Sequence, residues 1–136
     1  METERTTASL TAELAILAPA LRFDGFSSES DMPMQHYVTD ETVSEMTLDH
    51  LSAAVGHALE DCTDTIGETL DGMVRVAERF GEMVEVSRAF VRLMRGLSPL
   101  VGGVAKDIDG DERPAWLVGR SPEGHIIGVQ TAVVWT

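Results

Sequence analysis

The stretch that decides the fold is the C-terminal run Ile126-Ile-Gly-Val-Gln-Thr-Ala-Val-Val-Trp-Thr136. Its apolar and β-branched residues are typical of a β-strand, which we expect to hold Thr136 at a fixed place on the edge of a sheet. Strand alternation places four large apolar side chains on one face: Ile127, Val129, Val133 and Trp135. The other face also carries apolar residues. Both faces must therefore be covered, which predicts helices on each side of the sheet.

Further strands precede this one. Residues 115–119 lead into Ser121-Pro-Glu-Gly124, which has Pro and Gly where a type I turn favours them, so we predict a pair of strands, 115–119 and 126–136. Residues 100–108 form another expected strand. The first expected strand covers residues 34–39, after a turn-rich passage and Pro33.

Helical periodicity appears in three places. Leu10, Leu14, Leu17 and Leu21 make one apolar stripe, which predicts a helix from about Ser9. Thr47 is typical of the N-cap of a short helix, and we expect that helix to break up in the acidic residues 60–71, where glycines weaken it. Residues 73–97 give the longest helical pattern. Arginines alternate with glutamates on its polar face, so we interpret it as one long helix that covers the sheet.

These elements predict a single domain, residues 1–136, of the α+β class. The expected architecture is a three-layer α/β/α sandwich with a mixed, antiparallel-rich sheet. The chain of 136 residues, with 43% apolar residues, is long enough to bury its own core. Met1–Thr7 lacks the pattern of a secretory signal, and the single cysteine fits a reducing compartment, so we expect a cytoplasmic protein without a membrane segment.

Charge is distributed unevenly. The net charge is −13, and residues 1–71 hold 15 Asp/Glu against 2 Arg, whereas residues 72–136 hold 8 of each sign. A field this negative repels phosphate, which argues against direct binding of nucleic acid or of an anionic membrane. It favours a basic protein partner, and nucleic-acid enzymes are among the basic proteins.

Motifs for catalysis or metal binding are weak. The aspartates of residues 106–114 resemble a calcium loop, but glycine comes at the fourth place and Val118 stands where a bidentate Glu is required, so we reject that interpretation. His50 and His57 are seven residues apart, too far for the usual zinc spacing. No residue is placed to activate Cys62. We therefore expect no enzyme activity and no cofactor of the protein's own.

Three segments carry a resemblance. Residues 116–136 comprise an expected strand, a turn with Pro and Gly, and a last strand that ends in threonine. The segment Phe26-Ser-Ser-Glu-Ser-Asp-Met-Pro33 contains a Ser-Glu-Ser-x-x-Pro pattern. Phe80-Gly-Glu-Met-Val-Glu-Val86 is similar to a Phe-x-x-Leu-Leu-Glu-Val helix. In order and spacing these segments resemble the nuclease A inhibitor family, over about two fifths of the chain.

The resemblance implies a protein inhibitor of a sugar-non-specific, Mg-dependent endonuclease that cuts DNA and RNA. By that resemblance Thr136 supplies its hydroxyl and terminal carboxylate to the enzyme's magnesium, and Glu29 faces the basic cleft with Ser28 and Ser30 shaping its loop. Magnesium prefers such hard oxygen donors. The implied partner is a basic endonuclease, and the inhibitor is expected to be a monomer when free.

Two departures leave alternatives open. The family has a tryptophan in its central acidic loop, whereas Asp61-Cys-Thr-Asp-Thr-Ile-Gly-Glu68 has no aromatic residue. Trp135 stands where the family pattern is acidic, and it either adds contact area for the partner or packs under the sheet. The alternative function is an acidic interaction module for another basic protein. A small hydrolase or ligand-binding domain is the third hypothesis.

Overall fold

A computed structural model describes the protein over residues 6–136; most of the N-terminal stretch considered as a secretory signal lies outside this range. The α-helices are α1 (Thr7–Leu17), α2 (Leu48–Val55), α3 (Ile66–Phe80) and α4 (Val84–Arg95), and the 3-10 turns are η1 (Ala18–Ala20) and η2 (Thr63–Thr65). The strands are β1 (Arg22–Phe23), β2 (Met32–Pro33), β3 (Gln35–Thr42), β4 (Leu59–Asp61), β5 (Val101–Ala105), β6 (Glu112–Arg120) and β7 (His125–Val134).

One sheet of five strands organises the molecule, in the order β3-β7-β6-β5-β4, and β1 and β2 form a separate two-stranded sheet. Within residues 6–136 every strand pair is antiparallel, so the predicted mixed sheet is wrong. Short turns join β5 to β6 and β6 to β7, and such connections require antiparallel pairing, whereas β3 pairs with β7 across most of the chain. The α+β class is confirmed.

The expected pair of C-terminal strands is also confirmed, and both begin earlier than predicted; however, β7 ends at Val134, so the prediction that the strand runs to Thr136 was wrong. β6 and β7 pair from Glu112 opposite Val134 to Arg120 opposite Ile126. Because β7 lies between β3 and β6, it is an interior strand, and our expectation of an edge position was wrong.

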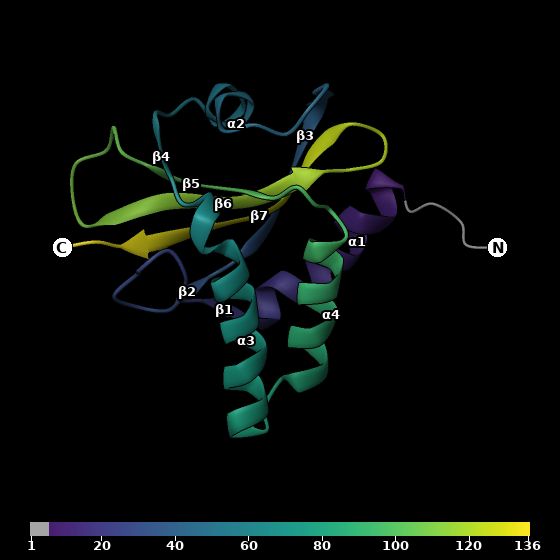
Figure 1. The fold of residues 1–136 in the computed structure, drawn as a ribbon, viewed down its shortest axis with the longest axis vertical. Helices are drawn as coiled ribbons and strands as arrows, with labels where there is room; N and C mark the ends of the chain where they lie inside the picture. The colour runs from purple at the N-terminus through teal and green to yellow at the C-terminus, as the bar shows by residue number, and fades with distance from the viewer. Residues whose placement is uncertain (1–5) are drawn as a thin grey trace.

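Apolar side chains cover both faces of this sheet, as the alternation in β7 predicted. Ile127 and Val129 belong to the larger buried cluster, together with residues of α1, α3 and α4. Ile126 belongs to a smaller cluster with Leu51 of α2 and Trp116. Figure 1 shows α2 on one side of the sheet and α1, α3 and α4 on the other.

The long helix predicted over residues 73–97 is wrong. The chain breaks into α3 and α4, which pack side by side as an antiparallel hairpin (Figure 1). Gly81 ends α3 in the left-handed conformation, with φ 67°. Glycine adopts this conformation without a steric penalty, so the turn forms there although the apolar periodicity continues through it.

The acidic residues 60–71 are more ordered than predicted. α2 ends at Gly56, and the chain continues into β4 and η2 before α3 begins at Ile66, with Gly67 and Gly72 inside that helix. Burial of Leu70 and Met73 outweighs the low helix propensity of the two glycines. The predicted Thr47 cap and the apolar stripe of α1 are confirmed: Thr47 accepts a hydrogen bond from the His50 backbone N–H, and Leu14 of α1 is fully buried. α1 begins at Thr7, two residues before the predicted start.

Candidate functional site

The best candidate site lies where residues 24–31 cross the end of β7. This loop contains Phe26 and Ser27, which have φ values of 55° and 58°. Two consecutive non-glycine residues in the left-handed region cost about 1–2 kcal/mol each, and such strain is found mainly where the surrounding structure enforces it, often at functional sites. Sequence reasoning missed this feature, because neither residue type indicates a left-handed backbone.

Packing holds the loop in place on two sides. Phe26 is buried and lies against Gly102 of β5, where any Cβ would clash with its ring. Gly25 approaches Thr69 of α3 so closely that an added Cβ would lie 2.3 Å from its methyl group. The strained loop is therefore fixed between the sheet and α3.

Hydrogen bonds then join the loop to the last strand. The Ser28 hydroxyl accepts the Val134 backbone N–H at 3.0 Å and donates to the Ser30 carbonyl at 2.7 Å. The Glu29 backbone N–H donates to the Val134 carbonyl at 2.9 Å. The loop thus satisfies both backbone groups of Val134, beyond Gln130, the last residue of β7 that pairs with β3.

Trp135 completes this connection. Its indole N–H donates to the Phe26 carbonyl at 2.9 Å, and its backbone N–H donates to the Asp111 carbonyl at 2.8 Å. The half-buried ring packs against the larger apolar cluster. Of the two roles left open for Trp135, packing under the sheet is therefore the one observed, and only the exposed remainder of the ring faces outward.

Thr136 and Glu29 meet at the solvent-exposed end of the strand. The Thr136 hydroxyl donates to Glu29 Oε1 at 2.5 Å, and both side chains are exposed. Glu29 Oε2 takes part in no hydrogen bond or ion pair with residues 6–136. The pair therefore presents a carboxylate oxygen and the lone pairs of a hydroxyl to the outside.

The structure brings all of the predicted site residues together, although Glu29 and Thr136 are 107 positions apart. We call this group the terminal site: Ser28, Glu29, Ser30, Trp135 and Thr136. Ser30 takes part in the terminal site mainly through its backbone carbonyl, which accepts from Ser28. Its own hydroxyl makes only a long contact, 3.4 Å, with the Asp31 carbonyl. Phe26 and Gly25 are the positioning residues that the sequence interpretation did not include.

The acidic side chains of residues 60–71 are all exposed, and two of them, Asp61 and Asp71, make contacts within the protein. Asp61 accepts the Thr63 backbone N–H at 2.9 Å, and hydrogen bonds from Thr63 lower the pKa of the Asp61 carboxyl. Cys62 is buried, and desolvation together with Glu60 and Asp61 raises the pKa of its thiol to about 11. The thiol therefore stays protonated, which is the idle role expected of it.

The histidines considered as zinc ligands contact separate groups. His50 Nδ1 lies 2.7 Å from the Thr47 hydroxyl, whereas His57 Nδ1 lies 3.0 Å from Asp107 Oδ1. Over residues 6–136 there is no cluster of three or more His, Cys, Asp or Glu side chains that could hold a metal ion. Over the same range no helix has the length and apolar character needed to cross a bilayer.

No protein-family model matches the chain, and a search of the curated proteins finds no match.

Proposed function

We propose that the protein inhibits a sugar-non-specific, Mg-dependent endonuclease by occupying its active site with the terminal site. The observation that carries this proposal is the exposed hydrogen bond between Thr136 and Glu29, at the end of a strand that a strained loop holds in place. The protein itself contributes no catalysis and no cofactor; Thr136 would bind only the partner's magnesium.

The chemistry of the pair suits a hard cation. The Thr136 oxygen donates its proton to Glu29 and keeps its lone pairs for a metal. We also propose a terminal carboxylate at Thr136 as a second oxygen ligand. Magnesium retains exchangeable water positions for a substrate phosphate, and anionic oxygen ligands can occupy these positions without presenting a bond to cleave.

Preorganisation supports the same function. Trp135 and Val134 are each tied to neighbouring backbone, so the last residues lose little conformational freedom on binding. Glu29 Oε2, which has no partner within residues 6–136, is available to an arginine of the cleft. Ser28 and Ser30 shape the loop that presents it.

Net charge supports the choice of partner. A cleft that attracts nucleic acid is basic, and a chain of charge −13 approaches such a cleft faster than a neutral chain would. Direct binding of nucleic acid or of a membrane is not part of the proposal.

We also propose that the fold is a three-layer α/β/α sandwich, and the apolar clusters on the two faces of the sheet support this architecture. We further propose a monomeric free state and a cytoplasmic location.

The same charge supports a second candidate, an acidic module that binds another basic protein without using Thr136. Its basis is the excess of 15 Asp/Glu over 2 Arg in residues 1–71, which needs no terminal ligand. The two candidates therefore differ in what the last residue does.

The test is inhibition of a panel of purified sugar-non-specific, Mg-dependent endonucleases, assayed on DNA and RNA with an untagged C-terminus. Deleting Thr136 or adding a Gly-Ser extension should abolish inhibition. Thr136→Val, which keeps the terminal carboxylate but lacks the hydroxyl, should weaken inhibition about tenfold to a hundredfold, since a charge-assisted contact contributes about 1.5–3 kcal/mol. Thr136→Ser should inhibit nearly as well as the wild type.

The matched control is Thr42→Val, which removes an exposed hydroxyl at the end of β3 and should leave inhibition unchanged. If deletion of Thr136 leaves binding to a basic endonuclease intact, the terminal site is not the inhibitory element and the acidic-module function replaces it. If no endonuclease of the panel is inhibited, the proposed function is wrong for that enzyme class.

A further inference from the structure

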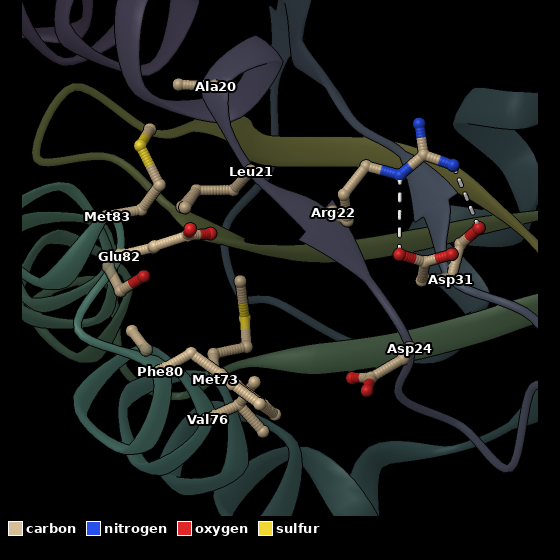
Figure 2. Close-up of a pocket in the computed structure, with 12 residues that line it drawn as sticks. Ala20, Leu21, Arg22, Asp24, Asp31, Met73, Val76, Phe80, Glu82 and Met83 are labelled. Atoms are coloured by element: carbon tan, nitrogen blue, oxygen red, sulfur yellow. Dashed lines mark hydrogen bonds and ion pairs between the residues drawn. The ribbon is translucent and has the colours of Figure 1, made fainter.

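A second surface lies on the helical hairpin. The groove between α3, the α3–α4 turn and the segment around β1 has a volume of about 320 Å³ (Figure 2). We call it the hairpin groove. Leu21 and Met73 form part of its wall, and the buried Ser87 of α4 also lines it.

This groove concentrates the exposed apolar side chains of the molecule. Over residues 6–136 four large hydrophobic side chains are exposed, and three of them line the hairpin groove: Val76 at 49%, Phe80 at 67% and Met83 at 46%. The fourth, Ile16, is 75% exposed on α1 and does not line it. Single exposed hydrophobic residues are ordinary, but a group around one depression is typical of a binding surface.

Two of these side chains lie at the turn between α3 and α4. Met83, the residue before α4, is held at φ 55°, a left-handed conformation that is unfavourable for a residue with a Cβ. The guanidinium carbon of Arg79 lies 5.6 Å from the centroid of the Phe80 ring, a cation–π contact at the tip of the hairpin. A flexible methionine beside an aromatic ring can adapt to different apolar side chains.

The charged groups that line the groove leave an excess of negative charge. Arg22 is engaged by Asp31, with Nε 3.6 Å from Oδ2 and a further bond to the Asp31 carbonyl at 3.1 Å. Asp24 and Glu82 have no side-chain hydrogen bond or ion pair with residues 6–136. In Figure 2 they come from opposite sides of the opening, Asp24 from the segment after β1 and Glu82 from the α3–α4 turn.

We propose that the hairpin groove docks a basic amphipathic segment of a partner protein. One bulky apolar side chain of that segment inserts beside Phe80 and Met83, and flanking lysines or arginines meet Asp24 and Glu82. This surface does not involve Glu29 or Thr136, so the proposal stands apart from the proposed function.

Charge complementarity favours a basic segment over a second copy of the chain, an anionic lipid surface or nucleic acid. A second copy docking through the same groove would bring the carboxylates of Asp24 and Glu82 close to their equivalents, which is unfavourable. An anionic lipid surface or nucleic acid would face the same carboxylates and a net charge of −13. A basic segment satisfies both the apolar depression and the carboxylates of Asp24 and Glu82. Its apolar side chain, not its cations, approaches Phe80, over which Arg79 lies.

The probe is a fluorescein-labelled helical peptide made of leucine and lysine in an amphipathic pattern, titrated by fluorescence anisotropy at near-physiological ionic strength. A peptide of the same pattern with glutamate in place of lysine tests the charge, and one with the same lysines spread evenly around the helix tests the apolar face. Only the amphipathic basic peptide should bind. In wild-type protein labelled for NMR, its shift changes should concentrate at Val76, Phe80 and Met83.

Two groove variants should each weaken binding about tenfold: Phe80→Ser, and the double variant Asp24→Asn with Glu82→Gln. Two matched controls should change it less than about twofold. Ile16→Ser removes the exposed hydrophobic residue outside the groove, and Glu45→Gln with Asp109→Asn removes the same charge from exposed positions elsewhere. Thermal unfolding checks that each variant is folded.

Three outcomes would overturn the proposal. Equal weakening in the charge control would mean that the peptide responds only to the overall acidity. Shift changes away from the hairpin would place the surface elsewhere. Concentration-dependent dimerisation in sedimentation, lost in Phe80→Ser, would make a second copy the occupant.

Discussion

At the scale of single residues, Ser28 joins the strained loop to the last strand. Its hydroxyl accepts from Val134 and donates to Ser30, so one oxygen satisfies backbone groups of two segments that are distant in sequence. Glu29 depends on this connection, because its own backbone N–H bonds the same Val134. The position of Glu29 is therefore set jointly by the Ser28 hydroxyl and by its own backbone N–H, which both bond Val134.

Ser28→Ala should lower the free energy of unfolding by about 1 kcal/mol, since the part-buried Val134 N–H loses its acceptor. Urea unfolding measures the loss, and amide hydrogen exchange at Val134 should become faster. Ser30→Ala is the matched control, because the Ser30 hydroxyl makes only a 3.4 Å contact and its removal should change stability by less than about 0.5 kcal/mol. Unchanged exchange at Val134 in Ser28→Ala would contradict the role assigned to Ser28.

At the scale of elements, glycine has opposite consequences in α3 and β7. Gly72 lies inside α3 with open space where a Cβ would stand. Gly128 of β7 lies so close to β6 that a Cβ would be 2.1 Å from the Leu117 carbonyl oxygen. The first glycine is therefore a cost to its helix, whereas the second allows two strands to approach.

Gly72→Ala should raise the free energy of unfolding by about 0.5–1 kcal/mol, because alanine has the higher helix propensity and no clash opposes it. Gly128→Ala should lower it by about 1–3 kcal/mol or more, since the Cβ meets backbone that cannot rotate away. Chemical denaturation of the two variants beside the wild type measures both changes. The same sign for the two substitutions would show that the contacts of β7 are not those described.

At the scale of the whole molecule, three carboxyl groups in separate places stabilise the fold through hydrogen bonds to their ionised forms. The Ala58 backbone N–H lowers the pKa of Asp107, the Thr7 backbone N–H lowers that of Glu123, and Thr63 lowers that of Asp61. A pKa lower in the folded state than in the unfolded chain means that unfolding takes up protons in acid. Stability should therefore be lost as the pH falls through these lowered values.

Asp107→Asn tests this dependence. Above the ordinary Asp pKa of 3.8 the wild type should be more stable than the variant, and the difference should shrink as the pH falls below that value through the lowered pKa of Asp107. Urea unfolding at a series of pH values measures it, with Asp109→Asn as a control for the loss of one exposed charge in the same loop. A difference that stays constant with pH would mean that Asp107 is not stabilised in its ionised form.

Local sequence signals were sufficient for the elements whose own residues determine them. The period-2 alternation of β7 predicted burial on both faces, because each face of a strand packs independently, and Ile126 and Ile127 do lie in different clusters. The Thr47 cap and the stripe of α1 were predicted for the same reason. The break at Gly81 was not, since the apolar periodicity of two antiparallel helices with a tight turn resembles that of one long helix.

The sequence by itself determined β3, β5, β6 and β7, the helices α1 and α2, the α+β class and the acidic character, because these follow from side-chain periodicity and composition. It did not predict β1, β2 or β4. Only the tertiary structure decided that β7 is interior, that every pairing is antiparallel, and that Glu29 meets Thr136. The tertiary structure also brings together the separate segments that line the hairpin groove. Contacts of this kind join residues far apart in the chain, and their free energy comes from packing and hydrogen bonds that no local pattern records.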